Sequence, residues 1–256
     1  MQRPAFRVIK ESCICLCACK TVFSSQAFIE REGRMAAKKG RGLLMVFVDV
    51  AEEVEDEFNR WYNEEHIAER LAIPGVLSAA RYVAIQGSPK YLAFYELDEA
   101  EAYYSDTWKN ILANPTDWSK RMSPTVIGKN FIRNVYRMIY PDALIEETIQ
   151  ADMSPAVLIG RMSVPAELDS KFNEAYNNER LPECFKVPGY IRNRRFEAVE
   201  GTPKYMTVHE IESPEVAETA DWKAWSAMVT PVWNSEVRPH MVHEAGSPGV
   251  YRRIFP

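Results

Sequence analysis

The sequence predicts an α+β fold in which two ferredoxin-like β-α-β-β-α-β repeats form a barrel within one chain. Three observations support this prediction. Residues 58–97 recur as residues 172–211, and both copies show the same order of strand-like and helix-like patterns. Each repeat would also leave one apolar sheet face without a helical cover. Two such faces in one chain can bury each other, and this would close the barrel.

The repeat is clearest where residues 58–97 align with residues 172–211 without a gap. Fifteen of the 40 aligned positions are identical. Two copies of about 100 residues are too few and too long for a solenoid, so the pattern indicates a duplicated domain. The shared residues include Phe58/Phe172, Tyr62/Tyr176, Glu65/Glu179, Pro74/Pro188, Gly75/Gly189 and Arg81/Arg195.

Each copy opens with a strand and a helix. Apolar runs rich in β-branched residues predict strands at residues 43–50 and 156–164. In the first copy a helix follows, because apolar residues recur at three- and four-residue spacings from Val54 to Leu71. A Pro-Gly pair ends this helix in both copies.

The rest of each copy contains two strands, a second helical region and a final strand. In the first copy the two strands are expected at 76–86 and 90–97, joined by a tight turn that contains a glycine. The final strand ends in YRMIYP or YRRIFP. We therefore expect a first repeat at residues 41–141, a linker at 142–154 and a second repeat at 155–256.

The first 40 residues are expected to lie outside this fold, as a disordered or over-extended N-terminal segment. Met35 directly precedes the run AAKKGRG and the first strand, so it would serve as a natural start. Four of the five cysteines lie in this segment, at residues 13, 15, 17 and 19. Their C-x-C alternation has no histidine nearby, so it is not typical of a structural zinc site.

The composition is typical of a soluble globular protein and excludes several classes of partner. The apolar fraction is 46% and the net charge is −5, which does not suggest a nucleic-acid partner. No apolar run approaches the roughly 20 residues that cross a bilayer, so no membrane partner is expected. The cysteine pattern favours a reducing, cytoplasmic location. The chain would act as a monomer, as a pseudo-dimer of its own repeats, or as a homodimer.

A set of residues in both copies resembles the EthD-like branch of the dimeric α+β barrel superfamily. The resemblance covers residues 43–140 and 156–256, and implies a pocket between each sheet and its helices or inside the barrel. Members include muconolactone-type isomerases, polyketide cyclases and cofactor-free monooxygenases, which act on hydrophobic, often aromatic or lactone compounds. The matching residues in the first copy are Trp61-Tyr62-x-x-Glu65-His66, Pro74-Gly75, Arg81-Tyr82 and GSPKYLAFYEL.

His66 is the leading candidate for a catalytic residue. It lies four residues after Tyr62, so both side chains share one helix face. An imidazole with a pKa near neutrality is the usual general acid or base for enolisation, lactone isomerisation or aldol-type cyclisation. Tyr62 would orient or polarise the substrate. The alternative is a histidine at a helix end that hydrogen-bonds a carbonyl or meets solvent.

Glu65 is a further catalytic candidate. It shares an apolar helical stripe with Phe58 and Trp61, where burial would raise its pKa. Its retention in the second copy favours instead a structural role, such as pairing with Arg81, because a buried carboxylate normally needs a partner.

The third strand of each copy presents two different faces. Leu92 and Phe94 lie on an apolar face that suits packing against helices. The opposite face, rich in tyrosine, threonine and histidine, could line a cavity and polarise a carbonyl. Alternatively, Tyr91 and Tyr205 only fill the barrel. The candidate substrate-binding residues are Trp61, Arg81, Tyr91, Tyr95, Tyr205 and His209.

The preferred hypothesis is a cofactor-independent isomerase, cyclase or lyase that acts by proton transfer on a small hydrophobic carbonyl, aromatic or lactone compound. A non-catalytic carrier of small hydrophobic ligands and a cofactor-free monooxygenase are the alternatives. No metal is expected, because His240 and His243 lack a clear third ligand. His66 is replaced by Arg180 in the second copy, so a single site would lie in the first half.

Overall fold

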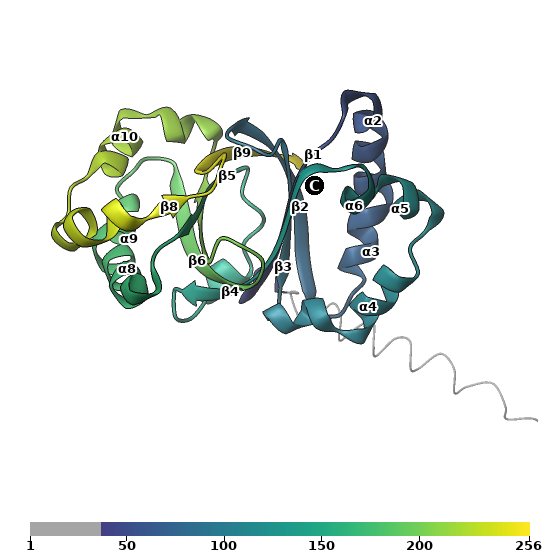
Figure 1. The fold of residues 1–256 in the computed structure, drawn as a ribbon, viewed down its shortest axis with the longest axis horizontal. Coiled ribbons are helices and arrows are strands. Elements are labelled where there is room, and N and C mark those ends of the chain that lie inside the picture. The colour runs from purple at the N-terminus through teal and green to yellow at the C-terminus, as the bar shows by residue number, and fades with distance from the viewer. Residues whose placement is uncertain (1–36) are drawn as a thin grey trace, which may run out of the picture. The chain divides into compact units, whose positions relative to one another are not determined.

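In the computed structural model, which describes residues 37–256, eight antiparallel strands close into a barrel with helices on its outside (Figure 1). The strands follow the order β7-β6-β4-β1-β3-β2-β9-β5, and β5 pairs with β7 to complete the ring. The predicted closure of a barrel within one chain is confirmed. The expectations for Met35 and the cysteines at 13–19 lie outside the described residues.

Residues 42–140 supply four strands and the helices on one side of the barrel (Figure 1). Around the barrel these strands follow the order β4-β1-β3-β2. They are β1 (Gly42–Asp49), β2 (Val76–Gln86), β3 (Tyr91–Leu97) and β4 (Lys129–Tyr140). The helical segments are α2 (Glu52–Trp61), η1 (Tyr62–His66), α3 (Ile67–Leu71), η2 (Ala100–Tyr104), α4 (Asp106–Ala113), α5 (Asp117–Met122) and α6 (Pro124–Ile127).

Residues 146–255 supply the other four barrel strands, in the order β9-β5-β7-β6, and the helices on the opposite side. The halves join where β4 pairs with β6 and β2 pairs with β9. The strands are β5 (Ala156–Ser163), β6 (Tyr190–Glu200), β7 (Tyr205–Ile211), β9 (Gly249–Phe255) and the short β8 (Val242–His243), which pairs with β5. The helical segments are α7 (Glu146–Ile149), η3 (Ala166–Leu168), α8 (Asp169–Ala175), η4 (Tyr176–Arg180), α9 (Leu181–Cys184), η5 (Pro214–Glu218), α10 (Ala220–Ala227), η6 (Trp233–Val237) and η7 (Arg238–His240).

The first helix of each half widens in the middle. In the first half, α2, η1 and α3 form one continuous helical segment, and the Ile67 amide donates to the Tyr62 carbonyl five residues earlier, which is π-helical geometry. The second half has the same widening at Tyr176–Arg180. Gly75 follows this segment with a φ of +88°, a conformation that glycine adopts without strain. Widened turns of this kind occur frequently at functional sites.

The barrel wall separates two kinds of core. Leu92 and Phe94 lie inside the barrel, whereas Tyr91, Ala93 and Tyr95 pack outside it against the helices. The prediction that Leu92 and Phe94 pack against helices is therefore wrong, because the apolar face fills the barrel and the tyrosine face meets the helices. All seven residues of β3 are buried, so alternation along the strand could not distinguish inside from outside.

A buried ionic cluster lies at the junction of the two halves. The Arg194 guanidinium donates to both carboxylate oxygens of Glu96, at 2.9 and 2.5 Å, and to Glu210 at 3.4 Å. The Lys39 ammonium lies 3.7 Å from Glu96 and 3.4 Å from Glu210. The Ser154 hydroxyl also donates to Glu210. Burial by itself raises the pKa of Glu210, but Lys39 and Arg194 more than offset it, so the pKa lies below its usual value.

Residues 37–40 belong to the folded unit, which corrects the predicted boundary at residue 41. Lys39 is only 2% exposed, and its backbone amide donates to the Ile149 carbonyl. The segment is held because the Lys39 ammonium balances buried carboxylates, a long-range requirement that the local sequence does not reveal.

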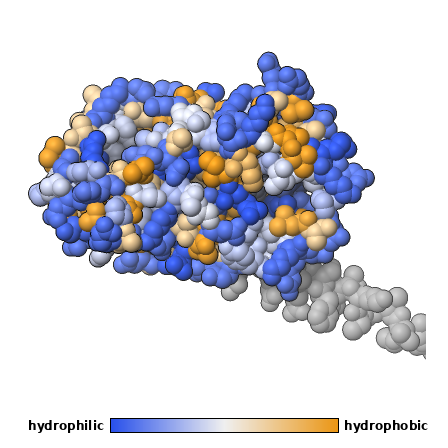
Figure 2. Space-filling model, viewed as in Figure 1, coloured by the Kyte–Doolittle hydropathy of each residue, from blue (hydrophilic) through white to orange (hydrophobic). Residues whose placement is uncertain are grey.

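The surface is mainly hydrophilic on the face shown in Figure 2, where apolar residues form small separate groups. No helix between residues 37 and 256 is long and apolar enough to cross a membrane.

Candidate functional site

A pocket in the first half lies between its helices and the outer face of its strands. It consists of two adjoining cavities of about 110 and 330 Å³, which share His66, Arg70, Leu112, Ser123 and Thr125. The smaller cavity is bounded mainly by aromatic and aliphatic side chains, so it suits an apolar ligand.

His66 lies where the two cavities meet. Its ring is 4.3 Å from the Trp61 ring and 4.9 Å from the Tyr62 ring, measured between centroids. The side chain is 11% exposed, and its Nδ1 atom has no hydrogen-bond partner among the residues described, although Glu69 Oε2 lies 3.9 Å away. Burial, followed by the positive charges of Arg70 and Arg81, holds the pKa of His66 well below its ordinary value. The imidazole is therefore neutral at physiological pH, and its lowered pKa makes it a weaker base than an exposed histidine.

Two tyrosines accompany this imidazole. Tyr62 and Tyr95 both line the smaller cavity. The Tyr95 ring is 6.4 Å from the His66 ring, and its buried hydroxyl lies within reach of the Tyr62 hydroxyl without forming a hydrogen bond of good geometry. Burial raises the pKa of both phenols, so they remain protonated and can act as donors.

Arg70 and Glu69 complete the polar side of the pocket. The Arg70 Nη1 atom lies 3.2 Å from Glu69 Oε2 and forms no hydrogen bond of good geometry, and the guanidinium carbon is 5.4 Å from the Trp108 ring. Burial raises the pKa of Glu69. Neither residue was predicted from the sequence, although Arg70 follows His66 by the same four-residue step that separates His66 from Tyr62.

Trp61 and Glu65 connect the first helix to α5. Trp61 borders the larger cavity, and its indole donates to Glu65 at 3.1 Å and to Ser119 at 3.2 Å. The same Glu65 oxygen accepts from Thr116 and Ser119. Glu65 lines neither cavity, so the structure favours the alternative that gave it a structural role.

Arg81 and Tyr91 lie in the packed core behind the pocket. The Arg81 guanidinium donates to the side chains of Asn59 at 2.6 Å and Asn63 at 2.8 Å, so the suggested pairing with Glu65 is wrong. The Tyr91 hydroxyl is bonded to Asn59 and Glu55. Neither residue lines the described cavities, and both hold the first helix against the sheet.

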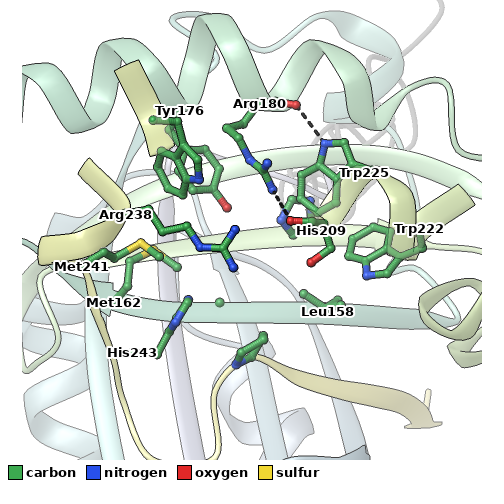
Figure 3. Close-up of a pocket in the computed structure, with 14 residues that line it drawn as sticks. Leu158, Met162, Tyr176, Arg180, His209, Trp222, Trp225, Arg238, Met241 and His243 are labelled. Carbon is green, nitrogen blue, oxygen red and sulfur yellow. Dashed lines mark hydrogen bonds between the residues drawn. The ribbon is translucent and has the colours of Figure 1, made fainter. Parts of the chain in front are cut away.

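The second half has its own pocket at the equivalent place (Figure 3). His209 lines it, and the Tyr190 hydroxyl is 2.8 Å from His209 Nδ1. Burial, followed by the charge of Arg180, lowers the pKa of His209 to about 3. Tyr205 lies away from this pocket, where its hydroxyl donates to Asp169 at 2.9 Å. The predicted site residues thus fall into two separate pockets and their supporting cores.

No group of three His, Cys, Asp or Glu side chains between residues 37 and 256 could hold a metal ion. His240 and His243 belong to the segment after η6, and only His243 lines the second-half pocket.

Comparison with solved structures gives the clearest relationship to known proteins. No family model matches the sequence, and no curated protein matches it. The structure of an anthrone oxidase-like protein shares 13% identity, with 85% of this chain and 93% of that chain covered and a TM-score of 0.51. Chlorite dismutase from Candidatus Nitrospira defluvii, in complex with imidazole, shares 11% identity over 89% and 95%, with a TM-score of 0.54.

The fold is that of the dimeric α+β barrels. At these identities the likeness establishes the fold alone. In this α+β barrel a single polypeptide supplies all eight strands.

The first-half pocket of this α+β barrel combines three chemical capacities. His66 offers a neutral base, Tyr62 and Tyr95 offer phenol donors, and Arg70 offers a buried positive charge. A base that faces donors and a cation can remove a proton from carbon and stabilise the negative charge that develops on an adjacent carbonyl oxygen.

Proposed function

We propose that the first-half pocket is the active site of a cofactor-independent enzyme that moves a proton on a small hydrophobic carbonyl, aromatic or lactone compound. The observation that supports this most strongly is the neutral His66 imidazole, which is largely buried and makes no hydrogen bond within the described residues. A structural histidine in such a place would normally satisfy its ring nitrogens.

In the proposed reaction the His66 imidazole takes a proton from the carbon next to the substrate carbonyl. The electron pair of the broken C–H bond moves onto the carbonyl oxygen and forms an enolate. The Tyr95 hydroxyl and the Arg70 guanidinium stabilise that oxygen, and the apolar walls exclude water. Return of the proton to another carbon gives an isomerase, and attack of the enolate on a second carbonyl gives a cyclase.

A cofactor-free monooxygenase is the second candidate. It needs the same proton abstraction, followed by reaction of the carbanion with dioxygen. The similarity in fold to an anthrone oxidase-like protein makes this variant worth testing. Oxygen uptake that depends on the substrate would separate it from an isomerase or cyclase, which consume no oxygen. A carrier would bind the same ligands without exchanging their protons.

We further propose that the chain belongs to the EthD-like branch and arose by tandem duplication of one ferredoxin-like β-α-β-β-α-β unit. Support comes from equivalent strand order in the two halves and from the π-helical turn at Tyr62–His66 and Tyr176–Arg180. Because the barrel is complete in one chain, we propose that a cytoplasmic monomer is sufficient for activity, and a homodimer would not complete the site.

The test is exchange of carbon-bound hydrogen for deuterium in D2O, followed by NMR with benzoylacetone as the probe. The wild-type protein should accelerate exchange over buffer, and His66→Gln should lower that acceleration about 10²–10⁴-fold, the usual contribution of a general base. His209→Gln is the matched control and should retain it. Equal exchange in wild type and His66→Gln, or no acceleration by the wild type, would refute the proposal.

A further inference from the structure

The second-half pocket has a charge distribution that calls for a ligand of its own. It is about 140 Å³ in volume and is built from β5, η4, β7, α10 and the segment after η6 (Figure 3). Two arginines, Arg180 and Arg238, line it together with His243. No aspartate or glutamate is among its described lining residues. Its positive charge is therefore not compensated within the pocket.

Arg180 is buried by indoles. It is 5% exposed, and its guanidinium carbon lies 4.7 Å from the Trp225 ring and 5.4 Å from the Trp233 ring. It donates to the Met228 carbonyl at 2.9 Å and the Ser226 carbonyl at 3.3 Å. A buried guanidinium that meets only neutral acceptors keeps its full charge uncompensated, and a bound anion would stabilise it.

Arg238 provides the second cation. Figure 3 shows its guanidinium directed into the pocket, between Arg180 and His243. Its side chain has no hydrogen bond or ion pair to any residue in the range 37–256. Burial and the charge of Arg238 both lower the pKa of His243, and Arg238 also contributes to the lowered pKa of Arg180, so these groups lie within electrostatic reach of one another.

The side chains that line the pocket favour a flat, apolar ligand. Trp222, Trp225 and Trp233 line the pocket, and Leu158 and Met162 supply aliphatic surface from β5. The volume is close to that of an apolar cavity of about 150 Å³ that holds one benzene molecule. An aromatic ring of this size would fill the space between the indoles and the sheet.

We propose that the second-half pocket binds a small aromatic carboxylate, of the size of benzoate, with its ring between the indoles and the strand and its carboxylate on Arg238 and Arg180. A guanidinium presents parallel N–H donors that match the two oxygens of a carboxylate. The first half cannot hold the same ligand in this way, since His66 occupies the position equivalent to Arg180. This site is separate from the proposed active site.

The test is isothermal titration of the full chain with benzoate, benzamide and acetate. Benzamide keeps the ring without the charge, and acetate keeps the charge without the ring. Benzoate should bind saturably, and both controls should bind at least about tenfold more weakly. Raising the salt concentration should weaken benzoate binding because the Arg238 end of the site is exposed. Absence of saturable benzoate binding up to about 10 mM, or equal binding of benzamide, would overturn the proposal.

Variants locate the site. Arg238→Gln should weaken benzoate binding about tenfold or more, because it removes one charge-assisted contact and leaves the fold undisturbed. Arg121→Gln, which replaces another exposed arginine, on α5, is the matched control and should bind like the wild type. His66→Gln should also leave binding unchanged, which distinguishes this site from the proposed active site. An Arg238→Gln protein that binds benzoate as tightly as the wild type would refute the proposed site.

NMR signals of the indole N–H groups provide an independent way to locate the benzoate site. The chain has six tryptophans, three of which line this pocket. Benzoate should shift the signals of Trp222, Trp225 and Trp233 and leave those of Trp61, Trp108 and Trp118 in place. Shifts confined to the first-half tryptophans would assign the ligand to the other pocket and contradict the proposal.

Discussion

The first-half pocket places a neutral imidazole where the second-half pocket places a guanidinium. His66 and Arg180 follow Tyr62 and Tyr176 by the same four residues. The His66 ring packs against the Trp61 indole, and the Arg180 guanidinium packs against the Trp225 indole. Yet one pocket offers a base and the other offers positive charge. The same backbone geometry thus supports two chemistries, because each depends on the side chain at one position and on its immediate neighbours.

The indoles show how the packing is preserved while the sequence changes. In the first half Trp61 lies on α2, 6.2 Å from Phe58 and 4.9 Å from Tyr62. In the second half an alanine replaces it, and the indole of Trp233 lies 6.0 Å from Phe172 and 5.0 Å from Tyr176. Trp233 comes from η6, at the position equivalent to Ser119. A large and a small residue have therefore exchanged places across the same contact.

The two halves differ most in the buried ionic cluster at their junction, and removing its arginine should have the largest effect on stability. Glu96 and Glu210 are equivalent residues, but Arg194 has only an alanine as its counterpart. Arg194→Ala should lower the free energy of unfolding by about 5 kcal/mol, the upper end for a broken buried pair, because it serves two carboxylates. Urea denaturation followed by circular dichroism measures this.

Arg137→Ala is the control for that loss. It removes a half-exposed arginine that pairs with Glu197 at 3.4 Å and should cost no more than about 1 kcal/mol. If Arg194→Ala were as mild as this control, the cluster would not hold the halves together.

The exchanged indole gives a second test with a smaller effect. Trp61→Ala should cost about 3–4 kcal/mol, because it leaves a cavity and removes the indole donor to Glu65. Ser119→Trp alone should also destabilise, since Trp61 already fills the space. The double variant should recover part of the loss by copying the arrangement of Ala175 and Trp233. Additive losses in a double-mutant cycle of urea unfolding would show that the two indoles are not interchangeable.

Much of the fold could be predicted from the sequence because its signals are local or repeated. The helix between Val54 and Leu71 follows from its spacing, and the boundaries of β2 were predicted at the observed residues, Val76–Gln86. The faces of β3 could not be predicted, since every residue of that strand is buried and its alternation has no polar side. Burial on both faces removes the usual signal.

The candidate site was less predictable. His66 and Tyr62 were found because a four-residue step on a helix places them on one face. The partners of Arg81 were missed, since Asn59 and Asn63 lie on another element and the contact depends on how the helix docks. Arg238 gave no local signal either, because its significance depends on the charges that surround it in space.

Both largely buried imidazoles should lower the stability of the protein in acid, and this is the smallest of the expected effects. His209 is 2% exposed with a pKa of about 3, far below the ordinary 6.5. Between pH 6.5 and pH 3 His209 therefore binds a proton in the unfolded chain but not in the folded chain. Its contribution to the free energy of unfolding is fully present above pH 6.5 and decreases as the pH drops toward 3. Between pH 7 and pH 5 this histidine should account for about 2 kcal/mol. His209→Gln should reduce the difference in unfolding free energy between these pH values, measured with urea, by that amount.

His66→Gln should also reduce this difference, because the pKa of His66 is lowered as well. An unchanged pH dependence in His209→Gln would mean that its imidazole is protonated or solvated in the folded protein, and would remove the contrast between a bonded His209 and an unbonded His66.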